Sequence, residues 1–188
     1  MRWILTVLIT VTLTGCYISN SADKPDELER TWAGATVAIP TSRYDPDLDD
    51  IGGLMRANEE ALLALELDQQ IPTIVFLHGC SGLHGVYRIS LNFLRDQGYA
   101  VIAPDSFSRA YKPQSCDWRT KSAGLHLGVV GFRLAEAEYA IERAKQFPWV
   151  DPDRIVLMGQ SEGGLTTANY SGDGIVGIDP LPLEQQVQ

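Results

Sequence analysis

The segment Arg154-Ile-Val-Leu-Met-Gly-Gln-Ser-Glu-Gly-Gly164 decides the fold of this chain. Its first five residues form a short, mostly apolar run, which is typical of a buried β-strand. The next six contain the pattern G-x-S-x-G. After a strand this pattern predicts a nucleophile elbow, a strained strand-to-helix turn that presents the hydroxyl of Ser161. The alternative is a glycine-rich turn in which Ser161 has no catalytic role.

Apolar runs and helical periodicities alternate along the rest of the chain. Strands are predicted at residues 34–39, 71–77, 99–103, 154–158 and 174–178, and helices at residues 51–67, 88–97, 131–147 and 162–170. In the helix at 131–147 the apolar residues form one stripe, and Glu136 is expected on the exposed face with the other charges. Strands that alternate with helices predict an α/β protein with a doubly wound, mostly parallel sheet.

The composition limits the class of protein. The chain has 188 residues, of which 45% are hydrophobic and 21% charged, as is ordinary for one globular domain. Its net charge is −9, and the sequence contains no basic stripe. Nucleic acid is therefore excluded as an expected partner.

The N-terminus has the features of an exported protein. Arg2 precedes an apolar stretch at residues 3–13, which is too short to span a bilayer but matches a signal-peptide core. The stretch leads into Leu13-Thr-Gly-Cys16, which resembles a bacterial lipobox. We therefore expect Cys16 to be lipidated and to anchor the chain on the periplasmic side of a membrane. Tyr17, in place of an aspartate, favours the outer membrane. The alternative is an ordinary secretory signal with an incidental cysteine.

This interpretation divides the chain into a signal peptide at 1–15, a polar tether at 16–31 and a globular domain at 32–188. Export would place the domain in an oxidising compartment, where paired thiols form disulfides. Once Cys16 is lipidated, Cys80 and Cys116 are the two remaining cysteines of the sequence. We therefore expect them to be bonded to each other.

Three motifs carry a resemblance to a known family. They are the segment at 151–164, the sequence His78-Gly-Cys-Ser-Gly82, and the sequence Ala103-Pro-Asp-Ser-Phe-Ser-Arg109. Together they resemble the dienelactone hydrolase-like branch of the α/β-hydrolases over about residues 70–180. The resemblance implies a carboxylic-ester or lactone hydrolase that acts on a small molecule and needs neither a cofactor nor a metal ion.

The resemblance also implies roles for individual residues. Ser161 would be the nucleophile that forms an acyl-enzyme, and the N–H groups of Cys80 and Glu162 would form the oxyanion hole. In the family's sheet the loops that carry Cys80 and Cys116 follow neighbouring strands, so the two cysteines can meet. Dienelactone hydrolase itself has a cysteine at the nucleophile position, so its particular substrate is not implied for this chain.

The family's acid and base follow later strands, which this sequence lacks. No histidine follows Ser161, and Asp179, at the end of the last predicted strand, is a weak candidate for the acid. His78 is expected to make a buried hydrogen bond that fixes the oxyanion loop, and His84 and His126 to be loop or surface residues. We therefore expect an α/β-hydrolase fold without its last strands, in a fragment or a truncated gene product.

Three functions are compatible with these residues. The first is a lipid-anchored serine hydrolase whose sequence is incomplete, because a serine hydroxyl needs a base to act as a nucleophile. The second is a non-catalytic, lipid-anchored binding or structural module that keeps the hydrolase pocket. The third is a truncation product without function.

Overall fold

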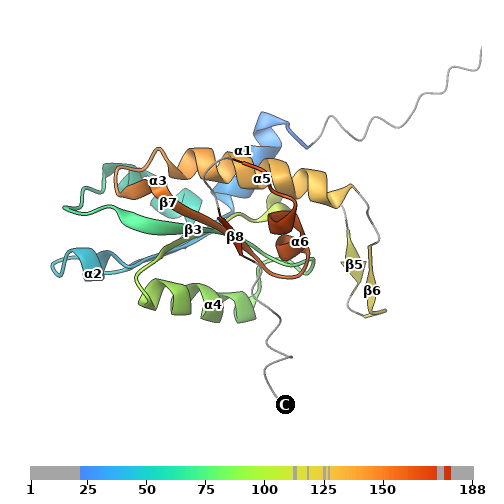
Figure 1. Cartoon of the computed structure of the whole chain (residues 1–188), viewed down its shortest axis with the longest axis horizontal. Coiled ribbons are helices and arrows are strands. Elements are labelled where there is room, and N and C mark those ends of the chain that lie inside the picture. The colour runs from blue at the N-terminus through green and yellow to red at the C-terminus, as the bar shows by residue number, and fades with distance from the viewer. Residues whose placement is uncertain are drawn as a thin grey trace, which may run out of the picture.

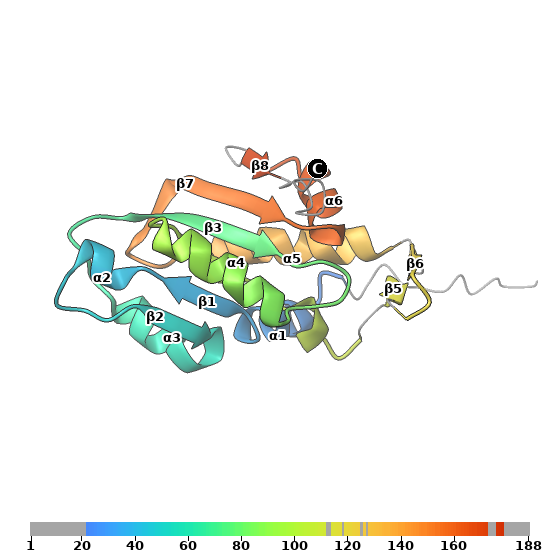
Figure 2. The same cartoon turned by 90° about the horizontal axis from the view of Figure 1, so that it is seen from below.

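The computed structural model describes residues 22–111, 114–117, 119–124, 126, 128–172 and 176–178. Within these residues six strands form one sheet in the order β2-β1-β4-β3-β7-β8 (Figures 1 and 2). Their bounds are β1 Thr36–Ile39, β2 Ile51–Leu54, β3 Ile71–Leu77, β4 Ala100–Ala103, β7 Val150–Gly159 and β8 Val176–Ile178. β3 is parallel to β4 and β7, and β7 is parallel to β8, whereas β1 is antiparallel to β2 and β4. The predicted mostly parallel α/β sheet is confirmed.

Helices cover both faces of this sheet. On one face lie α1 Pro25–Ala33, α3 Met55–Ala64 and α5 Val129–Ala144, and α6 Glu162–Ala168 packs against α5. The opposite face carries α4 Gly85–Asp96, as Figure 1 shows. The smaller elements are the helix α2 Thr41–Tyr44, the 3₁₀ turn η1 Ser106–Ser108, and a hairpin of β5 Cys116–Asp117 and β6 Ser122–Ala123. Among the described residues, none of the helices has the length and apolar character that a membrane span requires.

The core has two layers, one on each side of β3. Val75 and Leu77 belong to the larger layer, which the sheet forms with α1, α3 and α5. Ile74 and Phe76 point to the other side and pack with Tyr87 of α4. Because both faces of β3 are buried, its sequence is a continuous apolar run instead of an alternating one.

The first four residues of the helix predicted at 51–67 form a strand instead. Residues 51–54 are β2, which pairs with β1, and the helix α3 begins only at Met55. Gly52 and Gly53 have low helix propensity, and Gly53 has a φ of 120°, which a helix does not allow. The predicted helix at 51–67 was therefore correct only for residues 55–64.

The polar tether expected at 16–31 is helical in its last part. Residues 25–33 form α1, with Pro25 in the first turn, where its missing N–H group has no helical partner to lose. Leu28 and Trp32 lie one turn apart on this helix, and both are buried where α1 packs on α3, α5 and η1. The folded domain therefore begins several residues before the predicted boundary at residue 32.

Candidate active site

Ser161 lies in the turn that joins β7 to α6, and it is exposed to solvent. Its backbone has a φ of 57° and a ψ of −116°, which is a rare conformation for a residue with a side chain. The N–H of Gln160 donates to the carbonyl of Leu77 at 3.1 Å, and the N–H of Leu165 donates to the carbonyl of Ser161 at 2.9 Å. These bonds hold the strained turn on both sides, so Ser161 has the conformation of a nucleophile elbow.

Two glycines make this turn possible by close backbone packing. A Cβ atom added to Gly163 would lie 2.0 Å from the carbonyl oxygen of Leu77, at the end of β3. A Cβ atom added to Gly159 would lie 2.2 Å from the carbonyl carbon of Gly163. Side chains at either position would push α6 away from the sheet. The glycines of the G-x-S-x-G motif therefore set how closely the helix after Ser161 approaches β3.

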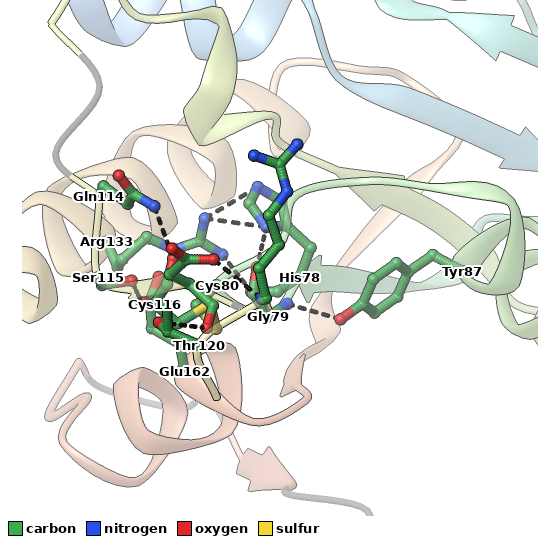
Figure 3. The surroundings of a disulfide bond; sticks show 12 residues. His78, Gly79, Cys80, Tyr87, Gln114, Ser115, Cys116, Thr120, Arg133 and Glu162 are labelled. Atoms are coloured by element: carbon green, nitrogen blue, oxygen red, sulfur yellow. Dashed lines mark hydrogen bonds between the residues drawn. A yellow bond between two sulfur atoms is a disulfide. The ribbon is translucent and has the colours of Figure 1, made fainter. Parts of the chain in front are cut away.

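The loop that follows β3 lies directly against the elbow. A Cβ atom added to Gly79 would be 3.4 Å from the Cβ of Ser161. The N–H of Gly79 donates to the hydroxyl of Tyr87 at 2.9 Å, which ties the loop to α4 (Figure 3). Cys80 is the next residue of this loop, and Glu162 follows Ser161 as the first residue of α6. The two residues assigned to the oxyanion hole thus belong to segments that meet beside Ser161.

His78 is fully buried, and both of its ring nitrogens have structural contacts. Nδ1 lies 2.7 Å from the carbonyl oxygen of Gly79, and the N–H of Ser106 donates to Nε2 at 3.2 Å, which places the ring proton on Nδ1. The guanidinium of Arg133 lies 3.0 Å from Nε2 and donates to the carbonyl of His78 at 2.9 Å. His78 therefore fixes the loop by buried hydrogen bonds, as expected from the sequence.

The charge state of His78 follows from these surroundings. Burial, and then the positive charge of Arg133, lower the pKa of His78 well below its usual value of 6.5. The ring is consequently neutral at neutral pH. Its approach of 3.7 Å to the carboxylate of Asp105 is for this reason not an ion pair.

The low pKa of His78 predicts a loss of stability in mild acid. Above pH 6.5 the imidazole is neutral in the folded and the unfolded chain. Below it, the unfolded chain binds a proton that the folded chain excludes, so the free energy of unfolding falls as the pH decreases towards the lowered pKa. The slope should reach about 1.4 kcal/mol per pH unit.

Urea unfolding at a series of pH values measures this slope. His78→Asn should remove the contribution of His78 to it, even if the variant is less stable at every pH. His84→Asn, which changes an exposed histidine, should leave the slope as in the parent chain. An unchanged slope in His78→Asn would contradict the assignment of the pH dependence to His78.

A group of buried charges lies beside His78. The side chains of Arg109, Arg133 and Glu136 are each 1% exposed. Glu136 accepts hydrogen bonds from Nε of Arg109 at 2.5 Å and from the hydroxyl of Ser106, and Nε of Arg133 lies 3.7 Å from its carboxylate. The prediction that Glu136 is exposed is therefore wrong, because Arg109, from the loop after β4, provides a counter-charge that the sequence of the helix does not show.

These charges border a small cavity behind the elbow. Its lining includes Ser115, Arg133, Glu136 and Glu162, and its volume is about 20 Å³. Nε of Arg133, one of the lining residues, is buried and has no hydrogen bond to the described residues. A space of this size holds about one water molecule. The cavity is therefore too small to be a substrate pocket.

A disulfide bond joins Cys80 to Cys116, with Cα atoms 5.7 Å apart. The structure thus contains the expected pair, which ties the loop after β3 to the start of the β5–β6 hairpin (Figure 3). Ser115, next to Cys116, donates a hydrogen bond from its hydroxyl to the carboxylate of Glu162. Sequence reasoning missed Ser115, because no local pattern marks a serine that contacts a residue so far along the chain.

The other two histidines lie against aromatic rings. The ring centre of His84 is 4.7 Å from that of Tyr87, and the ring of His126 is 6.1 Å from that of Phe132. In the part of the chain that the structure describes, no hydrogen bond joins a histidine to the side chain of Ser161.

Two of the predicted functional residues, Cys16 and Asp179, lie outside the described residues. Within those residues there is also no cluster of three or more His, Cys, Asp or Glu side chains that could hold a metal ion.

A serine elbow between a buried strand and a helix, on a mostly parallel sheet with helices on both faces, defines an α/β-hydrolase. The chain belongs to the dienelactone hydrolase family, whose model matches residues 60–178. Among curated proteins, none matches this sequence.

Several solved structures resemble part of this chain. A protein assigned as a dienelactone hydrolase from Klebsiella pneumoniae is 23% identical, with a TM-score of 0.47 over 58% of this chain and 47% of that chain. A dienelactone hydrolase-like promiscuous phosphotriesterase from metagenomic libraries is 18% identical, with a TM-score of 0.48 over 60% and 48%. Esterase B from Lactobacillus rhamnosis is 22% identical, with a TM-score of 0.34 over 53% and 29%. The chain matches less than half the length of each of these proteins.

Proposed function

We propose that this chain carries the nucleophile and the oxyanion hole of a serine hydrolase that cleaves carboxylic esters or lactones. The observation that carries the proposal is the conformation of Ser161, with a φ of 57° in an exposed turn between β7 and α6. This backbone conformation costs energy and does not stabilise the fold. Residues strained in this way are concentrated at functional sites. The chain's membership of a hydrolase family supports the same conclusion.

In the proposed reaction, Oγ of Ser161 attacks the carbonyl carbon of the ester while its proton passes to a base. The carbonyl oxygen becomes an oxyanion, which the N–H groups of Cys80 and Glu162 stabilise. Collapse of this intermediate expels the alcohol, leaves the acyl group on Ser161, and is followed by hydrolysis with water. The position of Gly79, whose added Cβ would be 3.4 Å from the Cβ of Ser161, supports an oxyanion site on this side of the elbow.

We place the general base outside the described residues. Both nitrogens of His78 have other contacts, and its pKa is low, so it is a poor proton acceptor for Ser161. His84 and His126 pack against the rings of Tyr87 and Phe132, and among the described residues neither has a hydrogen bond to Ser161. Asp179 stays a weak candidate for the acid.

The proposal predicts a Ser161-dependent but slow reaction. A fluorophosphonate probe should label Ser161 of the 188-residue chain only slowly, because this reaction needs the same base, and Ser161→Ala should abolish the labelling. Turnover of p-nitrophenyl acetate should be about 10⁶-fold below that of a chain with its histidine base, since this is the cost of losing that base in a serine triad. The same assays on the chain extended by the downstream reading frame test whether that segment supplies the base.

Ser171→Ala, which changes an exposed serine after α6, is the matched control and should be labelled like the parent chain. Labelling that survives Ser161→Ala would refute the nucleophile assignment. Fast Ser161-dependent turnover by the 188-residue chain would show that one of its own groups serves as the base.

The second candidate is a non-catalytic module that keeps the hydrolase fold for binding. It is favoured by one observation, that none of the described histidines is bonded to Ser161. The extended chain separates the two candidates. Unchanged, negligible turnover in the extended chain, together with absent probe labelling, would favour the binding module.

We also propose that the chain is exported and held at the periplasmic face of the outer membrane by lipidation of Cys16. The support is the sequence Leu13-Thr-Gly-Cys16 behind an apolar stretch. Mass spectrometry of the mature protein should find an acylated Cys16 at its N-terminus, and Cys16→Ser should block processing. A mature chain that begins elsewhere with an unmodified Cys16 would refute the anchor.

A further inference from the structure

Two consecutive residues of the β5–β6 hairpin region are linked to the two residues assigned to the oxyanion hole. Cys116 forms the disulfide with Cys80, and Ser115 donates its hydroxyl hydrogen bond to the carboxylate of Glu162. Figure 3 shows these four side chains as one group beside the end of β3. The hairpin is thus attached to both sides of the proposed hole at once.

The two sides of the hole come from different parts of the chain. Cys80 belongs to the loop after β3, and Glu162 begins α6, whereas the pairing of β3 with β7 ends at Leu77 and Gly159, before either donor. An oxyanion hole needs both donors about 2.7–3.1 Å from the oxyanion, and an error of about 1 Å costs about 100-fold in rate. A link between the two segments therefore has a direct use in catalysis.

The link through the hairpin is short and well held. Neighbouring Cα atoms are about 3.8 Å apart, so the attachment points at Ser115 and Cys116 are separated by one peptide unit. Ser115 is 6% exposed, and its bond to Glu162 has an ionised acceptor, which makes it stronger than a bond between neutral groups. The disulfide fixes the other end covalently.

We propose that Ser115 and Cys116 are positioning residues, which set the separation of the Cys80 and Glu162 N–H groups. This role rests on the proposed ester hydrolysis at Ser161. The side chains act through the backbone of the hole and not on the substrate. Loss of either attachment should slow the chemical step while substrate binding stays the same.

The test is single-turnover acylation by p-nitrophenyl acetate in the chain extended by the downstream reading frame, where the base is proposed to be present, with the rate of its Ser161→Ala variant subtracted. Ser115→Ala should lower the limiting acylation rate constant about 10-fold, because one oxyanion donor would be partly misplaced. The half-saturation concentration should change less than about twofold. Ser115→Thr, which keeps the hydroxyl, should restore most of the rate. Ser122→Ala is the matched control, because the Ser122 hydroxyl contacts Thr120 within the hairpin.

Reduction tests the other attachment without a mutation. Dithiothreitol transfers two electrons and two protons to the Cys80–Cys116 disulfide and closes to its own cyclic disulfide. The reduced chain should acylate about 10-fold more slowly, again at an unchanged half-saturation concentration. Thermal unfolding is used to check that each sample is folded at the assay temperature. If Ser115→Ala does not fold, the reduced parent chain alone tests the proposal.

The outcomes separate this proposal from the function on which it rests. If acylation does not depend on Ser161, the proposed function is refuted and the positioning role with it. If acylation depends on Ser161 but Ser115→Ala and reduction both leave the rate constant within about twofold, the positioning role alone is refuted. The positioning role is also refuted if Ser115→Ala changes only the half-saturation concentration, or if Ser122→Ala lowers the acylation rate constant as much as Ser115→Ala does.

Discussion

Replacing Glu136 by alanine is expected to lower the free energy of unfolding by about 3–5 kcal/mol, the usual cost of breaking a buried ion pair. The carboxylate is 1% exposed and provides a counter-charge to the guanidinium groups of Arg109 and Arg133. Without the carboxylate, the two guanidinium groups stay buried but lose an electrostatic attraction that offsets their desolvation. Arg133 also contacts His78, so the loop after β3 should loosen as well. Urea unfolding followed by circular dichroism measures the change.

Glu142→Ala is the matched control, because it removes a paired glutamate from the same helix. Glu142 lies 2.7 Å from Lys145 but is 57% exposed, so its loss should cost less than about 1 kcal/mol. Glu136→Gln keeps the acceptor for the hydroxyl of Ser106 and removes only the charge. Its loss in free energy of unfolding should lie between those of Glu136→Ala and Glu142→Ala. Equal losses in Glu136→Ala and Glu142→Ala would contradict the stabilising role of the buried charges.

Gly163→Ala is expected to destabilise the fold by about 3 kcal/mol or more, at the upper end for overpacked sites. The added Cβ would lie 2.0 Å from the carbonyl oxygen of Leu77 and 2.9 Å from that of His78. Both are backbone atoms at the end of β3, so no side chain can rotate away. The helix α6 would have to shift, and Ser161 with it, so fluorophosphonate labelling should fall together with the thermal midpoint.

Gly131→Ala is the matched control in α5. An added Cβ there has no atom within 4 Å, and the residue is exposed on the helix. Alanine should therefore stabilise the chain by up to about 1 kcal/mol through its higher helix propensity. A Gly163→Ala variant with parental stability and parental labelling would show that α6 does not need its close approach to β3.

The parts of the fold that the sequence predicts are those with strong local patterns. The apolar run of β3, the stripe of α5 and the serine motif after β7 all correspond to elements of the structure. The strand at residues 51–54 could not be found in this way, because it is defined by pairing with β1 and not by its own residues. α1 was missed for a similar reason, since its stability comes from burying Leu28 and Trp32 where it packs on the other helices.

The same distinction between local patterns and distant contacts applies to the candidate site. Ser161 and the loop that contains Cys80 were found because motifs with local geometry mark them. Ser115 and Glu136 were missed, since each acquires its role from a partner that is distant in sequence. The spacing of Arg133 and Glu136, one helical turn apart, suits an exposed ion pair equally well, so only the position of Arg109 reveals the burial.

Tyr87 occupies one amide group of the loop beside Ser161. Its hydroxyl accepts the N–H of Gly79 at 2.9 Å, so this amide is already satisfied and is not available to an oxyanion. In the proposed reaction the negative charge would then be shared by two donors on opposite segments, at Cys80 and Glu162. A carbonyl that points between them gains both hydrogen bonds, whereas one turned towards Gly79 finds the N–H group of that residue already bonded to Tyr87. The site would thus select esters by the direction of their C=O bond before any side-chain pocket comes into contact.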